Sequence, residues 1–233
     1  MHKFTIMART MARRMGITRL LRSVIAVQKY EMRFSDALTS ELREGDIVWD
    51  VGANVGFYTK TFLGIVGNSG SVVAFEPSPK SAARLLDLNE FKNLRVVQAA
   101  LGNKTGKAVF RINEDETSPV NNVVDSSEPG PNTIEIAMYR AEDALQLLAL
   151  SKPNVIKIDV EGYELECTEG LGRLLATKEL RAVFVEIHFE LLADRGLKFA
   201  PLSIEQVFKT AGFSVSWLDS SHLQAVRRQI VQL

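Results

Sequence analysis

The chain has 233 residues, of which 46% are hydrophobic and 24% charged, with 28 basic and 28 acidic side chains. This composition is that of a globular protein and excludes collagen-like and disordered chains, and the single cysteine, Cys167, excludes an intramolecular disulfide. No apolar run approaches the roughly 18 residues that a membrane-spanning helix requires, so we expect a cytoplasmic protein.

The N-terminal segment differs in charge from the rest of the chain. Residues 1–33 carry eight basic side chains and one acidic, whereas the other 200 residues carry 20 basic and 27 acidic. We expect residues 1–44 to form a basic helical extension that packs on its own domain or on a second copy in a homodimer. Peripheral contact with an anionic membrane is the alternative, while nucleic acid binding and a cleaved mitochondrial leader are disfavoured.

From residue 46 onward, short apolar runs alternate with longer amphipathic segments, which is the pattern of βαβ units around a mostly parallel sheet. We predict strands at 46–51, 71–75, 94–98, 155–159, 182–187, 213–218 and 222–229, and helices at 55–66, 79–91, 162–176 and 203–210. Residues 45–233 are therefore expected to form one α/β domain, Rossmann-like, with helices on both faces of the sheet.

The regular alternation breaks between the third and fourth predicted strands. Two further strands, at 109–112 and 133–138, flank a polar segment, residues 113–132. A long polar loop of this kind cannot form a core of its own and commonly covers a substrate. We therefore predict that this segment closes over a bound substrate.

A glycine-containing loop follows the first strand, at the carboxyl edge of the sheet where open α/β folds bind ligands. Gly52 would allow a sharp turn and a close approach of the backbone, and Gly56 close packing of the helix on a strand. Twenty residues after Gly56, Glu76 ends the second strand. A carboxylate at that position can accept both hydroxyls of a ribose, so the two features predict a nucleoside pocket.

The loop also indicates which nucleoside is bound. A dinucleotide site needs Gly-x-Gly-x-x-Gly, but here Asn54 stands where the middle glycine would be. The preceding acid, Asp50, would repel a pyrophosphate and suits the ammonium group of an amino acid. A ligand that joins a ribose to an amino acid without phosphate is S-adenosylmethionine, with Tyr58 expected to reach its carboxylate end. An NAD-binding oxidoreductase is the disfavoured alternative.

Four blocks of the sequence resemble the FkbM-like methyltransferases, a family of class I S-adenosylmethionine-dependent enzymes. The blocks are Asp50-Val51-Gly52-Ala53-Asn54-Val55-Gly56, Ala74-Phe75-Glu76-Pro77, Ile156-Lys157-Ile158-Asp159-Val160-Glu161-Gly162 and Val185-Glu186-Ile187-His188. The resemblance covers about residues 45–217 and implies a seven-stranded sheet of order 3-2-1-4-5-7-6. It also implies O-methylation of a hydroxyl on a sugar, glycan, polyketide or similar metabolite. The family's usual proline after the histidine is replaced by Phe189.

The same resemblance extends the cofactor site. It implies that Ala99 to Gly102 lie along the adenine, where the small side chain of Ala100 leaves room for the ring. It also matches the acidic pair Glu142-Asp143, which we predict to be a helix N-cap. The predicted cofactor-binding residues are Asp50, Gly52, Asn54, Gly56, Tyr58, Glu76, Pro77, Ala100 and Asp159.

Four polar residues end the fourth and fifth strands and are the predicted catalytic group: Asp159, Glu161, Glu186 and His188. Adjacent parallel strands lie about 4.8 Å apart, and side chains two residues apart share a face, so these groups can converge. Methyl transfer to a hydroxyl requires that the acceptor proton leave. We predict that His188 is the base and that Glu186 or Asp159 orients it or binds the acceptor hydroxyl.

Other interpretations of these residues remain open. Two carboxylates and a histidine could hold Mg²⁺ or another divalent metal, although we predict a site without metal. Asp159 could instead cap the helix that begins near Gly162, and Glu161 could be a first-turn acid of that helix. His188 could be a packed core histidine. A non-catalytic membrane or nucleic-acid adaptor is disfavoured, because it would not need all four blocks.

Overall fold

The computed structural model describes residues 32–88, 90–112, 121–124 and 130–227. The chain divides into two compact units, Met1–Ala37 and Leu38–Leu233. Of the first unit, residues 32–37 are described and are helical. The predicted basic extension therefore lies mostly outside the described residues, and its contacts with a second copy or a membrane stay predictions.

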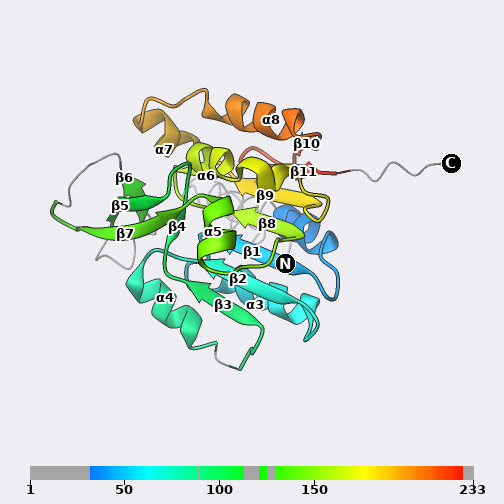
Figure 1. Ribbon diagram of the computed structural model, residues 1–233. Coiled ribbons are helices and arrows are strands. Elements are labelled where there is room, and N and C mark those ends of the chain that lie inside the picture. Colours follow the sequence, from blue (N-terminus) through cyan, green and yellow to red (C-terminus); the bar gives the residue numbers. More distant parts are fainter. Residues whose placement is uncertain (1–31, 89, 113–120, 125–129, 228–233) are drawn as a thin grey trace, which may run out of the picture. The chain divides into compact units, whose positions relative to one another are not determined.

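A seven-stranded sheet forms the centre of the second unit, with the order β10-β11-β9-β8-β1-β2-β3 (Figure 1). Its strands are β1 (Ile47–Val51), β2 (Ser71–Phe75), β3 (Leu94–Val97), β8 (Val155–Ile158), β9 (Ala182–Glu186), β10 (Ser214–Trp217) and β11 (His222–Val226). All pairings are parallel except those of β11 with β9 and β10. Numbered along the chain, these strands follow the order 3-2-1-4-5-7-6, so the predicted topology and α/β class are confirmed.

Helices cover both faces of this sheet (Figure 1), which explains why its central strands β1 and β8 are buried along almost their whole length. The helices are α3 (Phe57–Val66), α4 (Pro79–Leu86), α5 (Ala141–Leu147), α6 (Glu164–Gly170), the 3₁₀ helix η1 (Gly172–Ala176), α7 (Phe189–Asp194) and α8 (Ala200–Thr210). Helix α3 contacts β1 and β2, and α6 contacts α8. Within the described residues, no helix is both long enough and apolar enough to cross a bilayer.

A second, smaller sheet contains β4 (Ala100–Leu101), β5 (Gly106–Arg111), β6 (Asn122–Val124) and β7 (Thr133–Tyr139), in the order β4-β7-β5-β6. The inserted pair predicted at 109–112 and 133–138 is confirmed as the antiparallel strands β5 and β7. Strands β4 and β6 were not predicted. Most of the polar segment 113–132 lies outside the described residues, so its closure over a substrate stays a prediction.

Several element boundaries differ from those predicted. The helix expected over 79–91 ends at Leu86, and the one expected over 162–176 ends at Gly170, a weak helix former, with Leu171 between it and η1. Helix α7 was not predicted. Helix α8 begins before the predicted residue 203, with proline in its first turn.

The N-cap prediction for Glu142 and Asp143 is wrong, because Arg140 is the N-cap of α5 and the two acids lie in its first turn. There, Glu142 accepts a hydrogen bond from the backbone N–H of Arg173, and Asp143 accepts one from the hydroxyl of Thr105. These acids therefore connect α5 to neighbouring segments and do not cap it.

Candidate active site

The glycine loop after β1 lies directly against the end of β8. Gly52 has φ of +76°, and a Cβ at this position would lie 1.7 Å from the carbonyl oxygen of Asp159. Only glycine permits this approach. Gly56 has φ of +90°, and its Cβ would lie 2.8 Å from a methyl carbon of Leu85, so its close packing is against α4 and not against a strand as predicted.

Glu76, at the end of β2, holds this loop in place. Its Oε2 accepts a hydrogen bond of 2.8 Å from the backbone N–H of Asn54, and its Oε1 accepts one of 2.8 Å from that of Ser78. Burial raises the pKa of Glu76, and the two hydrogen bonds oppose the rise. Because each carboxylate oxygen has a second lone pair, both can still accept a ribose hydroxyl.

A cleft of about 630 Å³, which includes space open to solvent, lies beside the loop. The predicted residues that line it are Gly52, Asn54, Glu76, Pro77, Ala100, Asp159 and Glu161. Apolar side chains, among them Phe75 and Phe110, make up much of the remaining wall. Such a mixture of apolar walls and a few polar groups fits a nucleoside ligand, as does the carboxylate of Glu76.

Three predicted cofactor residues, Asp50, Gly56 and Tyr58, do not line this cleft. Asp50 is fully buried, where its Oδ2 accepts a hydrogen bond of 2.6 Å from the Thr59 hydroxyl and its Oδ1 lies 3.2 Å from Lys157 Nζ. The ring of Tyr58 stacks on that of Phe62 at 5.8 Å. The geometry therefore does not support the predicted direct contacts of Asp50 and Tyr58 with a ligand.

Lys157, for which no role was predicted, connects the loop to the end of β8. It lies opposite Asp50 because β1 and β8 are adjacent and parallel. Its Nζ donates to the Gly52 carbonyl oxygen at 3.0 Å and lies 3.4 Å from Asp159 Oδ2. Burial alone would lower the pKa of Lys157, but Asp50 and Asp159 raise it above the ordinary value. The buried ammonium thus balances both acids.

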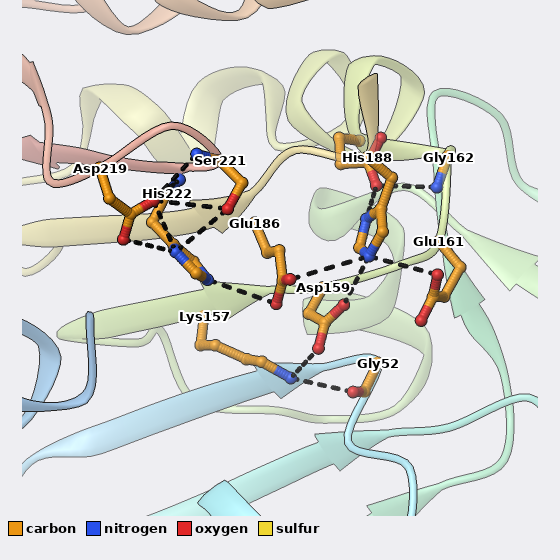
Figure 2. Close-up of polar contacts among 11 residues, drawn as sticks. Gly52, Lys157, Asp159, Glu161, Gly162, Glu186, His188, Asp219, Ser221 and His222 are labelled. Atoms are coloured by element: carbon orange, nitrogen blue, oxygen red, sulfur yellow. Dashed lines mark hydrogen bonds and ion pairs between the residues drawn. The ribbon is translucent and has the colours of Figure 1, made fainter. Parts of the chain in front are cut away.

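The four predicted catalytic residues meet around one imidazole (Figure 2). His188 Nε2 lies 3.2 Å from Glu161, 3.8 Å from Asp159 and 3.9 Å from Glu186. The orienting partner is none of these three. His188 Nδ1 lies 2.8 Å from Glu164 Oε1, which also accepts a hydrogen bond of 2.8 Å from the backbone N–H of Gly162. Glu164 is fully buried and therefore fixes the ring.

The pKa values in this group favour roles that differ from those predicted. Burial alone would lower the pKa of His188, but the hydrogen bond to Glu164 and the charges of Glu161 and Asp159 raise it to about 9. Burial raises the pKa of Glu161 to about 7, although His188 opposes the rise. At neutral pH His188 is therefore an imidazolium, and the group whose pKa matches a general base is Glu161.

Glu161 also has an unusual backbone. Its φ of +51° is rare outside glycine, and such residues occur preferentially in functional sites. The helix α6 begins at Glu164 with Tyr163 as N-cap and no capping side chain. The alternative in which Asp159 and Glu161 serve as cap and first-turn acid is therefore wrong.

A second histidine lies on the other side of Glu186. His222 Nε2 lies 3.5 Å from Glu186 Oε2, and His222 Nδ1 lies 2.8 Å from Asp219 Oδ2. Burial would raise the pKa of Glu186, but the hydrogen bond and charge of His222, with His188, lower it below the ordinary value. Neither His222 nor Asp219 was predicted, because their approach depends on the pairing of β11 with β9.

Among the described residues, Asp159, Glu161 and His188 form the group that could hold a metal ion, with one ligand atom from each lying within 4.8 Å of the others. One imidazole nitrogen and two carboxylate oxygens suit a divalent cation. Positive charge is already supplied there by Lys157 and by the protonated His188.

Comparison with known proteins agrees with the resemblance seen in the sequence. Residues 50–215 match the family described as the methyltransferase FkbM domain. A relative named hexuronic acid methyltransferase AglP, from Haloferax volcanii, is 33% identical over 155 residues, which cover 65% of this chain and 59% of that protein. The chain thus spans less than two thirds of that curated relative.

Two solved structures share the fold at low identity. Methyltransferase FkbM from Methylobacillus flagellatus KT has a TM-score of 0.53 and 15% identity, over 77% of this chain and 43% of that one. An rRNA methylase, so named as putative, from Clostridium thermocellum has a TM-score of 0.50 and 13% identity, over 88% of this chain and 96% of that one. At this identity the likeness concerns the fold alone.

Proposed function

We propose that this chain, which belongs to the FkbM methyltransferase family, transfers a methyl group from S-adenosylmethionine to a hydroxyl of a sugar. The observation that carries the proposal is one cleft lined by Glu76, Asp159 and Glu161 together. A carboxylate suited to a ribose and acids suited to an acceptor hydroxyl open on the same space. This arrangement favours methyl transfer over the NAD-dependent and adaptor alternatives.

The cofactor end of the cleft would be formed by backbone and small side chains. Glu76 would accept the ribose hydroxyls, and Ala99 and Ala100 leave space for an adenine ring. When bound, S-adenosylmethionine supplies an electrophilic methyl group on a sulfonium. Fixing the donor and the acceptor in line is itself a large part of such catalysis.

In this proposal Glu161 accepts the proton of the acceptor hydroxyl. That proton becomes strongly acidic as the oxygen gains its new bond to carbon, so a carboxylate whose pKa is about 7 is a sufficient base. His188 is protonated and lies 3.2 Å away, so its positive charge stabilises the ionised form of Glu161 before the proton is transferred. Asp159 and Glu186 remain available to accept hydrogen bonds from the acceptor.

The expected acceptor is a sugar, because the relative from Haloferax volcanii is named for a hexuronic acid. Carboxylates are hydrogen-bond acceptors, and a sugar presents several hydroxyl donors. Acids outnumber bases around His188, so a neutral acceptor group is favoured over an anionic one by Coulomb repulsion. We therefore propose methylation at a hydroxyl and not at a carboxylate of the sugar.

The test is an acceptor screen with methyl-labelled S-adenosylmethionine, in which free hexuronic acids, neutral hexoses and glycans are offered and the products analysed by mass spectrometry. Alkali treatment distinguishes an ether, which survives, from an ester, which is hydrolysed. Glu161→Gln should abolish labelling, and Glu190→Gln, an exposed acid on α7, is the matched control. Binding of NAD in place of S-adenosylmethionine would contradict the proposal.

A further inference from the structure

Asp219, His222 and Glu186 form a second acid–histidine arrangement beside the proposed site (Figure 2). It repeats the arrangement of Glu164 and His188. In both, one ring nitrogen contacts a carboxylate whose side chain is fully buried, and the other faces Glu186. Glu186 thus lies between two imidazoles, with Oε1 on the side of His188 and Oε2 on the side of His222.

The pairing of β11 with β9 places this arrangement at the edge of the sheet where the proposed site lies. His222 is the residue paired with Glu186 across the antiparallel strands β11 and β9, so both side chains lie on the same face. Asp219 is fixed in the preceding turn, where its Oδ1 accepts hydrogen bonds of 2.9 Å from the backbone N–H groups of Ser221 and His222. The imidazole is therefore held from both ends.

We propose that Asp219 and His222 are a positioning pair for Glu186: the imidazole, held by Asp219, fixes Oε2 and so leaves Oε1 on the side of the cluster where the acceptor is methylated. The proposal rests on the function proposed above. It makes His222 a residue that acts through Glu186 and does not itself touch the acceptor.

The charges around Glu186 explain why such a pair is needed. Burial raises the pKa of Glu186, while His222, His188 and Lys157 lower it, and Glu186 in turn raises the pKa of Asp159 and of Glu161. His222 makes the strongest favourable contribution, through its hydrogen bond and its charge. Facing His222 itself are Asp219 and Glu186, and both raise its pKa against the effect of burial. Removal of either acid should therefore lower the pKa of His222.

The pair also lies beyond the part of the chain that matches the family. That match ends at residue 215, four residues before Asp219. The pair is thus a feature of the β10–β11 hairpin of this chain.

The first measurement reads the contact without turnover. The chain has three histidines, so the imidazole proton resonances of His222 can be assigned by substitution and titrated by NMR. We expect His222 to titrate above its ordinary range, and to titrate at lower pH in both Asp219→Asn and Glu186→Gln. Gln224→Ala is the matched control, because Gln224 bonds to Ser216 on the same hairpin and should leave the titration unchanged.

The second measurement reads the effect on turnover. In Asp219→Asn, kcat should acquire an alkaline decline at the pH where His222 loses its proton in the NMR titration of that same variant. His222→Gln should lower kcat about tenfold to a hundredfold at every pH, with S-adenosylhomocysteine affinity unchanged by calorimetry. If Asp219 and His222 had a purely structural role, the substitutions would lower the melting temperature, but the midpoint of the kcat decline would not coincide with that of the His222 titration.

Two results would overturn the proposal. One is an identical His222 titration in the wild type and in Glu186→Gln. The other is a turnover profile of Asp219→Asn that follows the wild type although the His222 titration has moved. If no acceptor is methylated by the wild type, the function proposed above fails, and the NMR titration still decides whether His222 is coupled to Glu186.

Discussion

The glycine loop differs from the acid–histidine cluster, which consists of Asp159, Glu161, Glu186 and His188, in how its charged groups are fixed. In the loop, Glu76 is held by two backbone N–H groups, which carry no net charge and do not titrate. In the cluster, His188 is held by carboxylates, and each group sets the pKa of its neighbours. Changes in the loop should therefore alter cofactor affinity and stability, whereas changes in the cluster should alter the rate and its pH dependence.

The largest effect is expected from Glu161→Gln, which removes the proposed proton acceptor but preserves the shape of the side chain. Turnover should fall by about 10² to 10⁴, the usual contribution of a positioned general base, while affinity for S-adenosylhomocysteine stays within about twofold. Turnover assays and calorimetry measure the two quantities, and Glu190→Gln serves as control. Equal losses of affinity and turnover would indicate that Glu161 binds the cofactor and is not the proton acceptor.

The pH dependence of kcat/KM should be bell-shaped. Glu161 must be ionised to accept a proton, so the rate should rise with pH through the pKa of about 7. His188 must stay protonated to stabilise the ionised Glu161, so the rate should fall as pH rises through the pKa of His188, about 9. These limbs are macroscopic properties of a coupled group. His188→Asn should remove the alkaline limb; a rate that instead climbs through pH 9 would restore His188 as the base.

On the cofactor side, Glu76→Ala should weaken binding of S-adenosylmethionine at least about tenfold, because hydrogen bonds to a charged group contribute about 1.5 to 3 kcal/mol each. It should also lower the melting temperature, since the N–H groups of Asn54 and Ser78 lose their partner. Calorimetry on the folded fraction separates the two effects. Glu135→Ala, which breaks an exposed pair with Lys107, is the control, and unchanged affinity in Glu76→Ala would contradict the assignment.

The sequence predicts a part of each of these two regions. The spacing from Gly52 to Glu76 lies within one βαβ unit, whose geometry is regular enough to place Glu76 beside the loop. The convergence of Asp159, Glu161, Glu186 and His188 followed from two adjacent parallel strands. Both inferences needed only local patterns and the strand order.

What could not be predicted depends on contacts between segments distant in the chain. The pairing of His222 with Glu186 requires the antiparallel return of β11, and the neutralisation of Asp50 requires the register of β1 with β8. Glu164 carried a weak signal, as the third acid within six residues after β8, following Asp159 and Glu161. The order of pKa values, on which the proposal of Glu161 instead of His188 as the base rests, depends on burial and on all these charges together.

The smallest effect is expected from removal of divalent metal. Incubation with EDTA should change turnover by less than about twofold, since the positive charge that a cation would bring to Asp159 is supplied by Lys157 at 3.4 Å. The imidazolium of His188 supplies a second positive charge, beside Glu161. Turnover before and after chelation, with and without added Mg²⁺, is the measurement.

The contrary outcome would be distinctive. If EDTA abolished turnover and Mg²⁺ restored it, Asp159→Ala and Glu161→Ala should each be as damaging as a change at His188, because every ligand of a metal centre matters. Mn²⁺ binding, followed by its paramagnetic signal, would then depend on Asp159, Glu161 and His188. Without a metal, Asp159→Ala should act mainly by leaving Lys157 with one carboxylate fewer. Its effect on the rate should then be smaller than that of Glu161→Gln. The ratio of the turnover rates of these two variants is therefore the sharpest single measure of whether the cluster is stabilised by a metal or by Lys157 and His188.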